Sequence, residues 1–243
     1  GYEWVDLVGD PEFLLIGDSH AKQYISALRN MNKKVSLISE SACISLPNLI
    51  NEYKYQQQTR NNCLKLQKKY MNYIDENSSI RTIILAHSWD KEIFDLKNNK
   101  AVGRAENSDV SRLLYLNGLK EKLNKLTQKE KEIIIIGSVP NELNVSDKMK
   151  KGYIKCLYSS LENNCQKSFA YSDRSNQWIN KFLSDISDSF SNITFVDPSQ
   201  WLCDNEKCWI VKQKRLAYVD HSHLSNFAAN KIIKGINEIG LLE

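Results

Sequence analysis

Five short apolar runs, rich in β-branched residues, alternate along this chain with stretches of helical periodicity. Continuous runs of this kind are typical of strands that are covered on both faces. Between them, apolar residues recur at helical spacing, and Ser225 is a candidate N-cap of the last helix. This alternation predicts a three-layer α/β/α sandwich around a mainly parallel sheet. The expected strands are 13–17, 35–38, 81–86, 132–137 and 193–196, and the expected helices are 21–30, 110–126, 178–190 and 225–239.

The length of 243 residues suits one hydrophobic core. No internal repeat, low-complexity tract or Pro/Gly-rich linker marks a second domain, so residues 1–243 are expected to form a single one. Two stretches fit the strand and helix pattern poorly. Residues 45–77 are polar and expected to be largely helical, whereas residues 141–172 are expected to be loop-like. A chain that opens at Gly1 without a basic and apolar leader is expected to be a domain of a longer protein.

Charge and hydropathy argue against two classes of partner. The 33 basic and 29 acidic residues leave a net charge of only +4, and no basic block is interleaved with aromatic residues. Nucleic acid is therefore not an expected partner. The longest purely aliphatic run, Ile133–Ile136, is far shorter than the roughly 20 residues that cross a bilayer, so no membrane segment is expected.

The six cysteines form three pairs of near neighbours along the chain. An even number suits disulfides, but six cysteines allow about 15 connectivities, so we assign the pairs by proximity alone. Six reduced thiols are the alternative. A zinc site is disfavoured because there is no C-x-x-C and the histidines are not clustered with the cysteines. Disulfides persist in a periplasm or outside the cell. The expected pairs are Cys43 with Cys63, Cys156 with Cys165, and Cys203 with Cys208.

A candidate nucleophile lies where the first expected strand ends, in the tetrapeptide Gly17-Asp18-Ser19-His20. A serine at this position is exposed at the carboxyl edge of the sheet. The N-terminus of the following helix presents backbone N–H groups to a developing oxyanion. The alternative is that Asp18 or Ser19 merely caps the helix.

A candidate base and its orienting carboxylate lie just before the last expected helix. Asp220 and His223, three residues apart on one turn, allow the carboxylate to hold one imidazole nitrogen while the other faces a serine. His221 competes for this role, but neighbouring side chains in an extended stretch point apart, which disfavours its pairing with Asp220. Both motifs can reach the same edge of a parallel sheet. Together they predict a triad of Ser19, His223 and Asp220.

These motifs resemble those of a known family. LLIGDSH near the start and YVDHSHLS near the end resemble the first and last motif blocks of the SGNH hydrolase superfamily, whose Ser, His and Asp form a triad. The Leu202-Cys203 to Cys208 loop and LAHSW at residues 85–89 resemble, more narrowly, SGNH domains fused behind acyltransferase-3 membrane domains. By motif order the resemblance spans essentially the whole chain. It implies a flavodoxin-like α/β fold and O-acetylation of bacterial surface polysaccharides, including lipopolysaccharide O-antigen.

The resemblance also implies a location and partners. Acetyl groups from cytoplasmic acetyl-CoA would cross the membrane through the protein's own upstream acyltransferase-3 domain. This domain would then stand on the periplasmic side of the inner membrane, with residues 1–12 as the remnant of a linker. A polysaccharide would be the acceptor. No metal or bound cofactor is expected, and the isolated domain is expected to be monomeric.

The chain departs from the superfamily at the third motif block. Residues 87–90 read His-Ser-Trp-Asp, where the superfamily has G-x-N-D and draws an oxyanion donor from the Asn. Trp89 is equally well interpreted as core packing or as a functional residue, either a platform for a sugar ring or part of the acyl pocket. His87 and Asp90 are expected to be structural or solvated. The candidate oxyanion donors are Ser19, Ser41, Ala42, Ser88 and Trp89.

The sequence therefore predicts a serine-dependent O-acetyltransferase that works through an acetyl-serine. One alternative is a secreted carbohydrate acetylesterase that uses the same triad with water as the acceptor. A second is a catalytically silent domain that presents glycan to a separate membrane enzyme.

Overall fold

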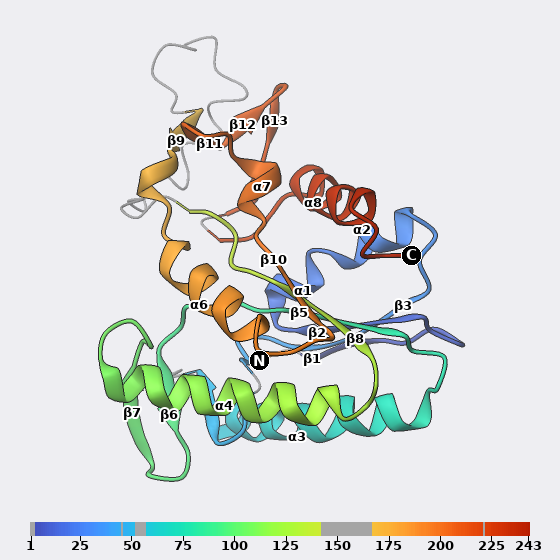
Figure 1. Ribbon diagram of the computed structural model, residues 1–243, viewed down its shortest axis with the longest axis vertical. Helices are drawn as coiled ribbons and strands as arrows, with labels where there is room; N and C mark the ends of the chain where they lie inside the picture. The colour runs from blue at the N-terminus through green and yellow to red at the C-terminus, as the bar shows by residue number, and fades with distance from the viewer. Residues whose placement is uncertain (1–2, 45, 52–56, 142–166, 221) are drawn as a thin grey trace.

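A six-stranded sheet forms the centre of the molecule in the computed structural model (Figure 1), which describes residues 3–44, 46–51, 57–141, 167–220 and 222–243. The strand order is β1-β3-β2-β5-β8-β10, and neighbouring strands are parallel except β1 and β3. Without β1, the order is that of flavodoxin-like sheets. The predicted α/β fold class is thus confirmed. The bounds are β1 Glu3–Asp6, β2 Phe13–Gly17, β3 Val35–Glu40, β5 Thr82–Ala86, β8 Glu132–Ile136 and β10 Ile193–Val196.

Helices cover both faces of this sheet (Figure 1). In β2 every side chain is buried, and successive side chains enter opposite layers, as a strand's pleat requires. Phe13 and Leu15 pack toward α1, α2 and α8, while Leu14 and Ile16 pack toward α3, α4 and α6. The helices are α1 Ser19–Lys22, α2 Ile25–Asn30, α3 Gln57–Glu76, α4 Asp109–Thr127, α6 Gln177–Ser187 and α8 Asn226–Glu238.

The helix boundaries largely follow the sequence. The hydroxyl of Ser225 accepts a hydrogen bond from the N–H of Ala228 and caps α8, as predicted. The helix expected over 21–30 is instead two short helices, because α1 ends at Lys22 and α2 begins at Ile25. Among the described residues, no helix is long and apolar enough to cross a bilayer.

Smaller β elements lie outside the main sheet. In the stretch 45–77, α3 agrees with the helical expectation, but β4 pairs with β6 and β7 in a separate antiparallel sheet. In the stretch expected to be loop-like, β9 pairs with β11 and a short 3-10 helix, η2, follows β9. The bounds are β4 Leu49–Asn51, β6 Ile93–Asp95, β7 Lys100–Gly103, β9 Ser168–Ala170, η2 Tyr171–Asp173, β11 Lys207–Trp209, β12 Val211–Lys212 and β13 Arg215–Leu216.

The first residues of the described chain form part of the main sheet. Strand β1 pairs antiparallel with β3 at the edge of the sheet, and Asp6 accepts a 2.7 Å hydrogen bond from Arg29 of α2. The segment expected to be a linker remnant therefore contains an edge strand. Its backbone covers β3, which would otherwise be the exposed edge.

Two of the predicted disulfides are present. Cys43–Cys63 joins the loop after β3 to α3, and Cys203–Cys208 joins the end of α7, which spans Ser199–Leu202, to β11. Cys156 and Cys165 lie outside the described residues, so their predicted pairing stays a prediction.

Candidate active site

A tight strand-to-helix turn places Ser19 at the carboxyl edge of the sheet. Strand β2 ends at Gly17, and Ser19 is the first residue of α1. A Cβ at Gly17 would lie 1.8 Å from the carbonyl oxygen of Ala86, at the end of β5, and 2.7 Å from the Cβ of Ala21. Glycine is therefore required for β2 and α1 to approach β5 this closely. This point, where the chain switches from one side of β2 to the other, is where flavodoxin-like sheets bind their ligands.

Ser19, His223 and Asp220 form one hydrogen-bonded chain. The Oγ of Ser19 lies 2.7 Å from Nε2 of His223, and Nδ1 of His223 lies 2.7 Å from Oδ2 of Asp220. Because a carboxylate only accepts, Nδ1 carries the proton and Nε2 accepts from the serine hydroxyl. The geometry is that of a nucleophile, a general base and its orienting carboxylate. His221 lies outside the described residues.

The Asp220 carboxylate is held by its own turn. Its Oδ1 accepts hydrogen bonds of 2.8 Å from the backbone N–H groups of Ser222 and His223. Burial alone would raise the pKa of Asp220, but these bonds, the imidazole bond and the charge of His223 together lower it to about 2. The carboxylate is thus ionised at neutral pH, as an orienting partner of the imidazole must be.

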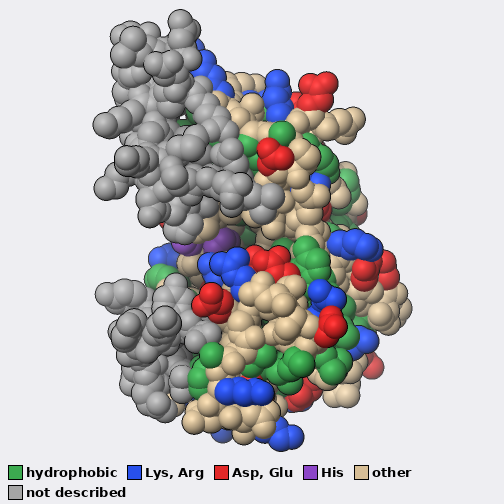
Figure 2. Space-filling model, turned by 90° about the vertical axis from the view of Figure 1, so that its left-hand side faces the viewer, with side chains coloured by type: hydrophobic (Ala, Val, Ile, Leu, Met, Phe, Trp, Pro, Cys, Tyr) green, Lys and Arg blue, Asp and Glu red, His purple; other side chains and the backbone are tan. Residues whose placement is uncertain are grey.

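The histidine loop is fastened to the nucleophile's helix. The N–H of Leu224 donates to Oε1 of Gln23, which follows α1, at 2.8 Å, and the N–H of Val219 donates to the carbonyl of His223 at 2.9 Å. The His20 ring lies 4.8 Å from the ring of His223. On the face drawn in Figure 2, histidine side chains show at the surface beside basic side chains, and 30% of the His223 side chain and 45% of the Asp220 side chain are exposed.

Asp18 caps the helix and also ties the nucleophile's turn to the third motif block. It is 1% exposed, and its Oδ1 accepts from the N–H of His20 at 2.8 Å, while Oδ2 accepts from the N–H of Ser88 at 3.0 Å. Burial raises the pKa of Asp18 to about 6, against the lowering effect of these bonds. The capping alternative thus describes Asp18, whereas Ser19 faces His223.

Two of the candidate oxyanion donors already have partners within the fold. The Ser88 N–H is bound by Asp18. The Trp89 indole is 0% exposed and donates to the carbonyl of Ile136 at 2.7 Å. Trp89 is therefore a core residue, and the idea of a sugar platform there is wrong. Asp90, expected to be structural or solvated, forms an ion pair with Arg104 at 3.4 Å.

The loop after β3 carries two further candidate donors. Ser41 and Ala42 lie there, and Ala42 has φ 53°, a left-handed conformation that favours glycine over other residues. Strain of this kind is often retained at functional sites. The following residue, Cys43, is anchored to α3 by its disulfide.

A buried histidine binds the same loop and is itself paired with a buried lysine. His87 is 1% exposed and Lys122 of α4 is 2% exposed. Nδ1 of His87 lies 3.1 Å from the Cys43 carbonyl, so it must donate, and Nε2 therefore accepts from Nζ of Lys122 at 3.2 Å.

Burial lowers both pKa values, and the lower pKa of His87 favours the neutral ring that accepts from Lys122. Burial, followed by the charge of Lys122, lowers the pKa of His87 well below its ordinary value. Burial lowers the pKa of Lys122 to about 7, although the charge of Asp18 acts in the opposite direction. The sequence analysis missed Lys122. Its signal is a charge on the apolar face of α4, three residues after Leu119 and four before Leu126.

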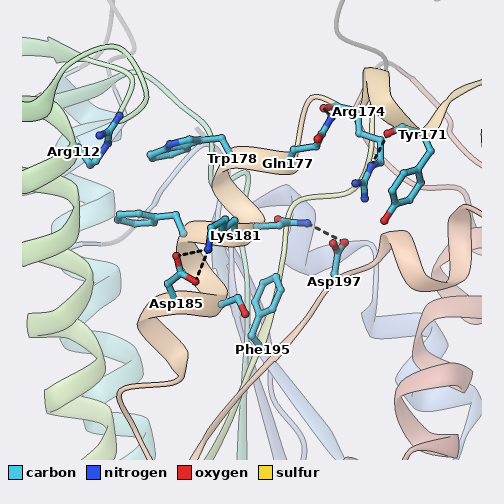
Figure 3. A pocket seen from close by; sticks show the side chains of 12 residues that line it. Arg112, Tyr171, Arg174, Gln177, Trp178, Lys181, Asp185, Phe195 and Asp197 are labelled. Atoms are coloured by element: carbon cyan, nitrogen blue, oxygen red, sulfur yellow. Dashed lines mark hydrogen bonds and ion pairs between the residues drawn. The ribbon is translucent and has the colours of Figure 1, made fainter. Parts of the chain in front are cut away.

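A separate cavity of about 670 Å³ lies between α4, α6 and the carboxyl end of β10 (Figure 3). None of the three triad residues lines it. Within the described ranges, no three of the His, Cys, Asp and Glu side chains are placed to hold a metal ion.

Comparisons with known proteins agree with this fold. The periplasmic domain of a lipopolysaccharide acetyltransferase from Salmonella ser. Paratyphi A superposes with a TM-score of 0.67 at 15% identity, covering 95% of this chain and 84% of that one. A GDSL-like lipase from Bacteroides thetaiotaomicron is more distant, with a TM-score of 0.48 at 9% identity over 96% of this chain and 88% of its own. At 15% identity the likeness to the Salmonella domain shows the fold alone. No curated protein sequence matches the chain.

The family itself is shown by the sequence match. Residues 3–237, nearly the whole chain, match the model of the SGNH domain that is fused to AT3 domains. The match covers the Ser19 turn, the disulfide-anchored loop and the Asp220–His223 turn described above. The chain therefore belongs to the family of SGNH domains fused to AT3 domains.

Proposed function

We propose that this domain is a serine-dependent O-acetyltransferase with Ser19, His223 and Asp220 as its catalytic triad. The observation that carries the proposal is the continuous hydrogen-bonded chain from Asp220 through His223 to Ser19. Three side chains from the two ends of the sequence meet there in the order that nucleophilic catalysis requires.

The mechanism has two half-reactions. His223 takes the proton of the Ser19 hydroxyl as Oγ attacks the acetyl carbonyl, and it then protonates the leaving group, which leaves an acetyl-serine. An acceptor hydroxyl next gives its proton to His223 and attacks the acetyl carbonyl. Ser19 leaves with the proton from His223. The N–H groups of Ser19 and Ala42 are the proposed donors to the oxyanion of both tetrahedral intermediates.

The proposed acceptor is a hydroxyl of a bacterial surface polysaccharide, lipopolysaccharide O-antigen in particular. Family membership supports an upstream acyltransferase-3 domain as the route by which acetyl groups from acetyl-CoA arrive. The structural neighbour from Salmonella is a periplasmic domain of a lipopolysaccharide acetyltransferase, and the two disulfides suit that compartment. We propose the same periplasmic side of the inner membrane for this domain.

Water in place of the acceptor would make the same site an esterase, because the triad activates either hydroxyl. The third reading, a silent glycan-presenting domain, is disfavoured by the intact hydrogen-bond chain. The products separate these readings: a transferase yields acetylated oligosaccharide, an esterase yields free acetate, and a silent domain yields neither.

The test is acetyl release from p-nitrophenyl acetate by the wild-type domain and by Ser19→Ala, His223→Ala and Asp220→Asn. Each change is expected to lower the rate by about a thousandfold or more, because triad residues act as a unit. Ser26→Ala, an exposed serine on α2, is the matched control and should leave the rate unchanged. An inactive wild type, or an unimpaired Ser19→Ala, would refute the triad.

A further inference from the structure

The cavity between α4, α6 and β10 combines aromatic rings with positive charge (Figure 3). Trp178 and Phe182 of α6 stack with ring centroids 5.1 Å apart, and both are only partly buried. Tyr171 of η2 carries the guanidinium of Arg174 3.3 Å from its ring. Aromatic faces beside planar polar groups are suited to sugars, whose rings have apolar faces and polar edges.

The acidic side chains of the cavity are engaged within the protein. Lys181 holds both carboxylate oxygens of Asp185 at 3.0 Å. Asp197 accepts from the Asn180 amide at 3.0 Å and from the N–H of Ser199 at 2.8 Å. Lys181 balances the charge of Asp185, Asp197 is held by neutral donors, and among the described residues neither carboxylate forms an ion pair with the two arginines.

The two arginines lie on either side of Trp178 (Figure 3). The only carboxylate within ion-pair distance of Arg112, among the described residues, is Asp109, at 3.4 Å and 98% exposed. Water screens such a pair strongly. The Nε of Arg174 donates to the Tyr171 carbonyl, and no carboxylate lies within ion-pair distance of it in the described part of the chain. Arg112 also lies over the Trp178 ring at 5.6 Å, as Arg174 does over Tyr171, so the cavity offers the edges of two ring-stacked guanidinium groups to an incoming anion.

We propose that this cavity is an acceptor subsite for an acidic oligosaccharide, one that carries carboxylates on its sugar rings. The rings pack against the exposed parts of the aromatic side chains, and the carboxylates bind Arg112 and Arg174, whose planar guanidinium groups match them. A neutral glycan would use the aromatic surface but leave both guanidinium groups unmatched. The inference rests on the proposed function and narrows its substrate class.

A shared loop connects the cavity to the triad. Asn180 of α6 accepts from the N–H of Ser138 at 2.8 Å, and Asn176 donates to the Ser138 carbonyl at 2.7 Å. Two residues further on, the Pro140 carbonyl accepts from the hydroxyl of Tyr218, just before the Asp220–His223 turn. Helix α6 and the histidine loop are therefore fixed to the same segment after β8. Because β2 and β10 belong to the same parallel sheet, Ser19 after β2 and Asp197 after β10 lie at the same edge of that sheet.

The experiment compares two reactions in the same variants. Arg174→Gln, Arg112→Gln and Trp178→Ala are assayed for p-nitrophenyl acetate hydrolysis and for acetyl transfer from that ester to oligogalacturonate. Hydrolysis should stay within about twofold of wild type, whereas KM for oligogalacturonate should rise about tenfold with kcat unchanged. Arg215→Gln, on β13 and outside the cavity, is the matched control. The same oligosaccharide with its carboxyl groups reduced to alcohols should have a high KM that Arg112→Gln and Arg174→Gln do not change.

Direct binding keeps this inference separate from the catalytic proposal. Ser19→Ala protein should bind oligogalacturonate in a calorimetric titration, more weakly after Arg174→Gln and at higher salt. Binding that is equal in all variants, or equal for the acidic and the reduced oligosaccharide, overturns the acidic-glycan subsite while leaving the triad intact. Hydrolysis that Ser19→Ala does not impair overturns the proposed function. In that case the binding result still decides whether the cavity is an acidic-glycan subsite.

Discussion

Replacing Lys122 by methionine is expected to make the protein more stable and less active. The lysine is 2% exposed, and its pKa falls from 10.5 to about 7 on folding. When folding lowers the pKa of a base, proton binding stabilises the unfolded state at any pH between the folded and the unfolded pKa. At pH 7.5 this protonation difference costs roughly 4 kcal/mol of stability as an upper limit. Methionine has a similar length and carries no charge.

The gain in stability is reduced because methionine cannot donate a hydrogen bond to His87. Nε2 of His87 loses its donor and becomes a buried acceptor without this partner, which costs about 1–3 kcal/mol. The net expectation at pH 7.5 is a stabilisation of about 1–3 kcal/mol. Because His87 also donates to the carbonyl of Cys43, next to Ala42, kcat for p-nitrophenyl acetate is expected to fall by about tenfold.

The assay is urea unfolding at pH 7.5 and pH 9.0. Over this range the wild-type free energy of unfolding should rise by roughly 2 kcal/mol, since the unfolded lysine stays protonated while the folded one does not. Asp18, with a pKa of about 6, and His87, with a pKa below its ordinary value, keep constant protonation there. The rise should vanish in Lys122→Met.

Lys125→Met is the matched control. Lys125 lies on the same helix, is exposed, and pairs with Glu121 at 2.7 Å, so its loss should change stability by less than about 1 kcal/mol and leave the pH dependence intact. The reasoning is refuted if Lys122→Met retains the rise between pH 7.5 and 9.0. It is also refuted if the variant is less stable than wild type at pH 7.5.

Three further predictions concern the scaffold of the site. Gly17→Ala should lower the free energy of unfolding by about 3 kcal/mol or more, because the added methyl group would meet the Ala86 carbonyl, whereas Gly9→Ala, with nothing within 4 Å, should change it little. Ala42→Gly should leave the free energy of unfolding in urea nearly unchanged, because relief of the left-handed strain offsets the greater chain entropy of glycine in the unfolded state. Ala42→Val should lower that free energy by about 1–2 kcal/mol. Equal free energies of unfolding for the two variants would contradict the strain. Replacing both Cys43 and Cys63 by alanine should cost about 3 kcal/mol, since their bond closes a loop with a sequence separation of 20, and equal unfolding midpoints would argue against that contribution.

The main strands were predictable because their side chains are buried on both faces. Runs such as those of β2 and β8 leave few other folds open, and the structure places them in a parallel sheet as predicted. Strand β1 was not predictable in this way. Its Trp4 is only partly buried and its Val5 is exposed, and its place depends on backbone bonds to β3, which side-chain patterns do not reveal.

The residues of the candidate site also differ in how clearly the sequence alone indicates them. Ser19, Asp220 and His223 stand out in the sequence because reactive residue types follow a strand or precede a helix. Lys122 shows in the sequence only as a charge on the apolar face of a helix, and its pairing with His87 becomes apparent only once α4 is packed over the sheet. The place of the Trp89 indole in the core was likewise not predictable, since its burial is a property of the completed core.

The bond between Ser19 and His223 spans a sequence separation of 204 residues, nearly the full chain. Contacts of such long range close a very large loop, so they form late unless other interactions bring the ends together first. Here α2, just after the nucleophile, packs against α8, just after the histidine, and both must dock on the same face of the sheet. A nascent chain in which α8 has not yet been synthesised and docked therefore contains Ser19 without His223 beside it. In the proposed mechanism, acyl transfer requires that this last helix has docked, so we expect nascent and partly folded forms of the domain to be inert toward acyl groups.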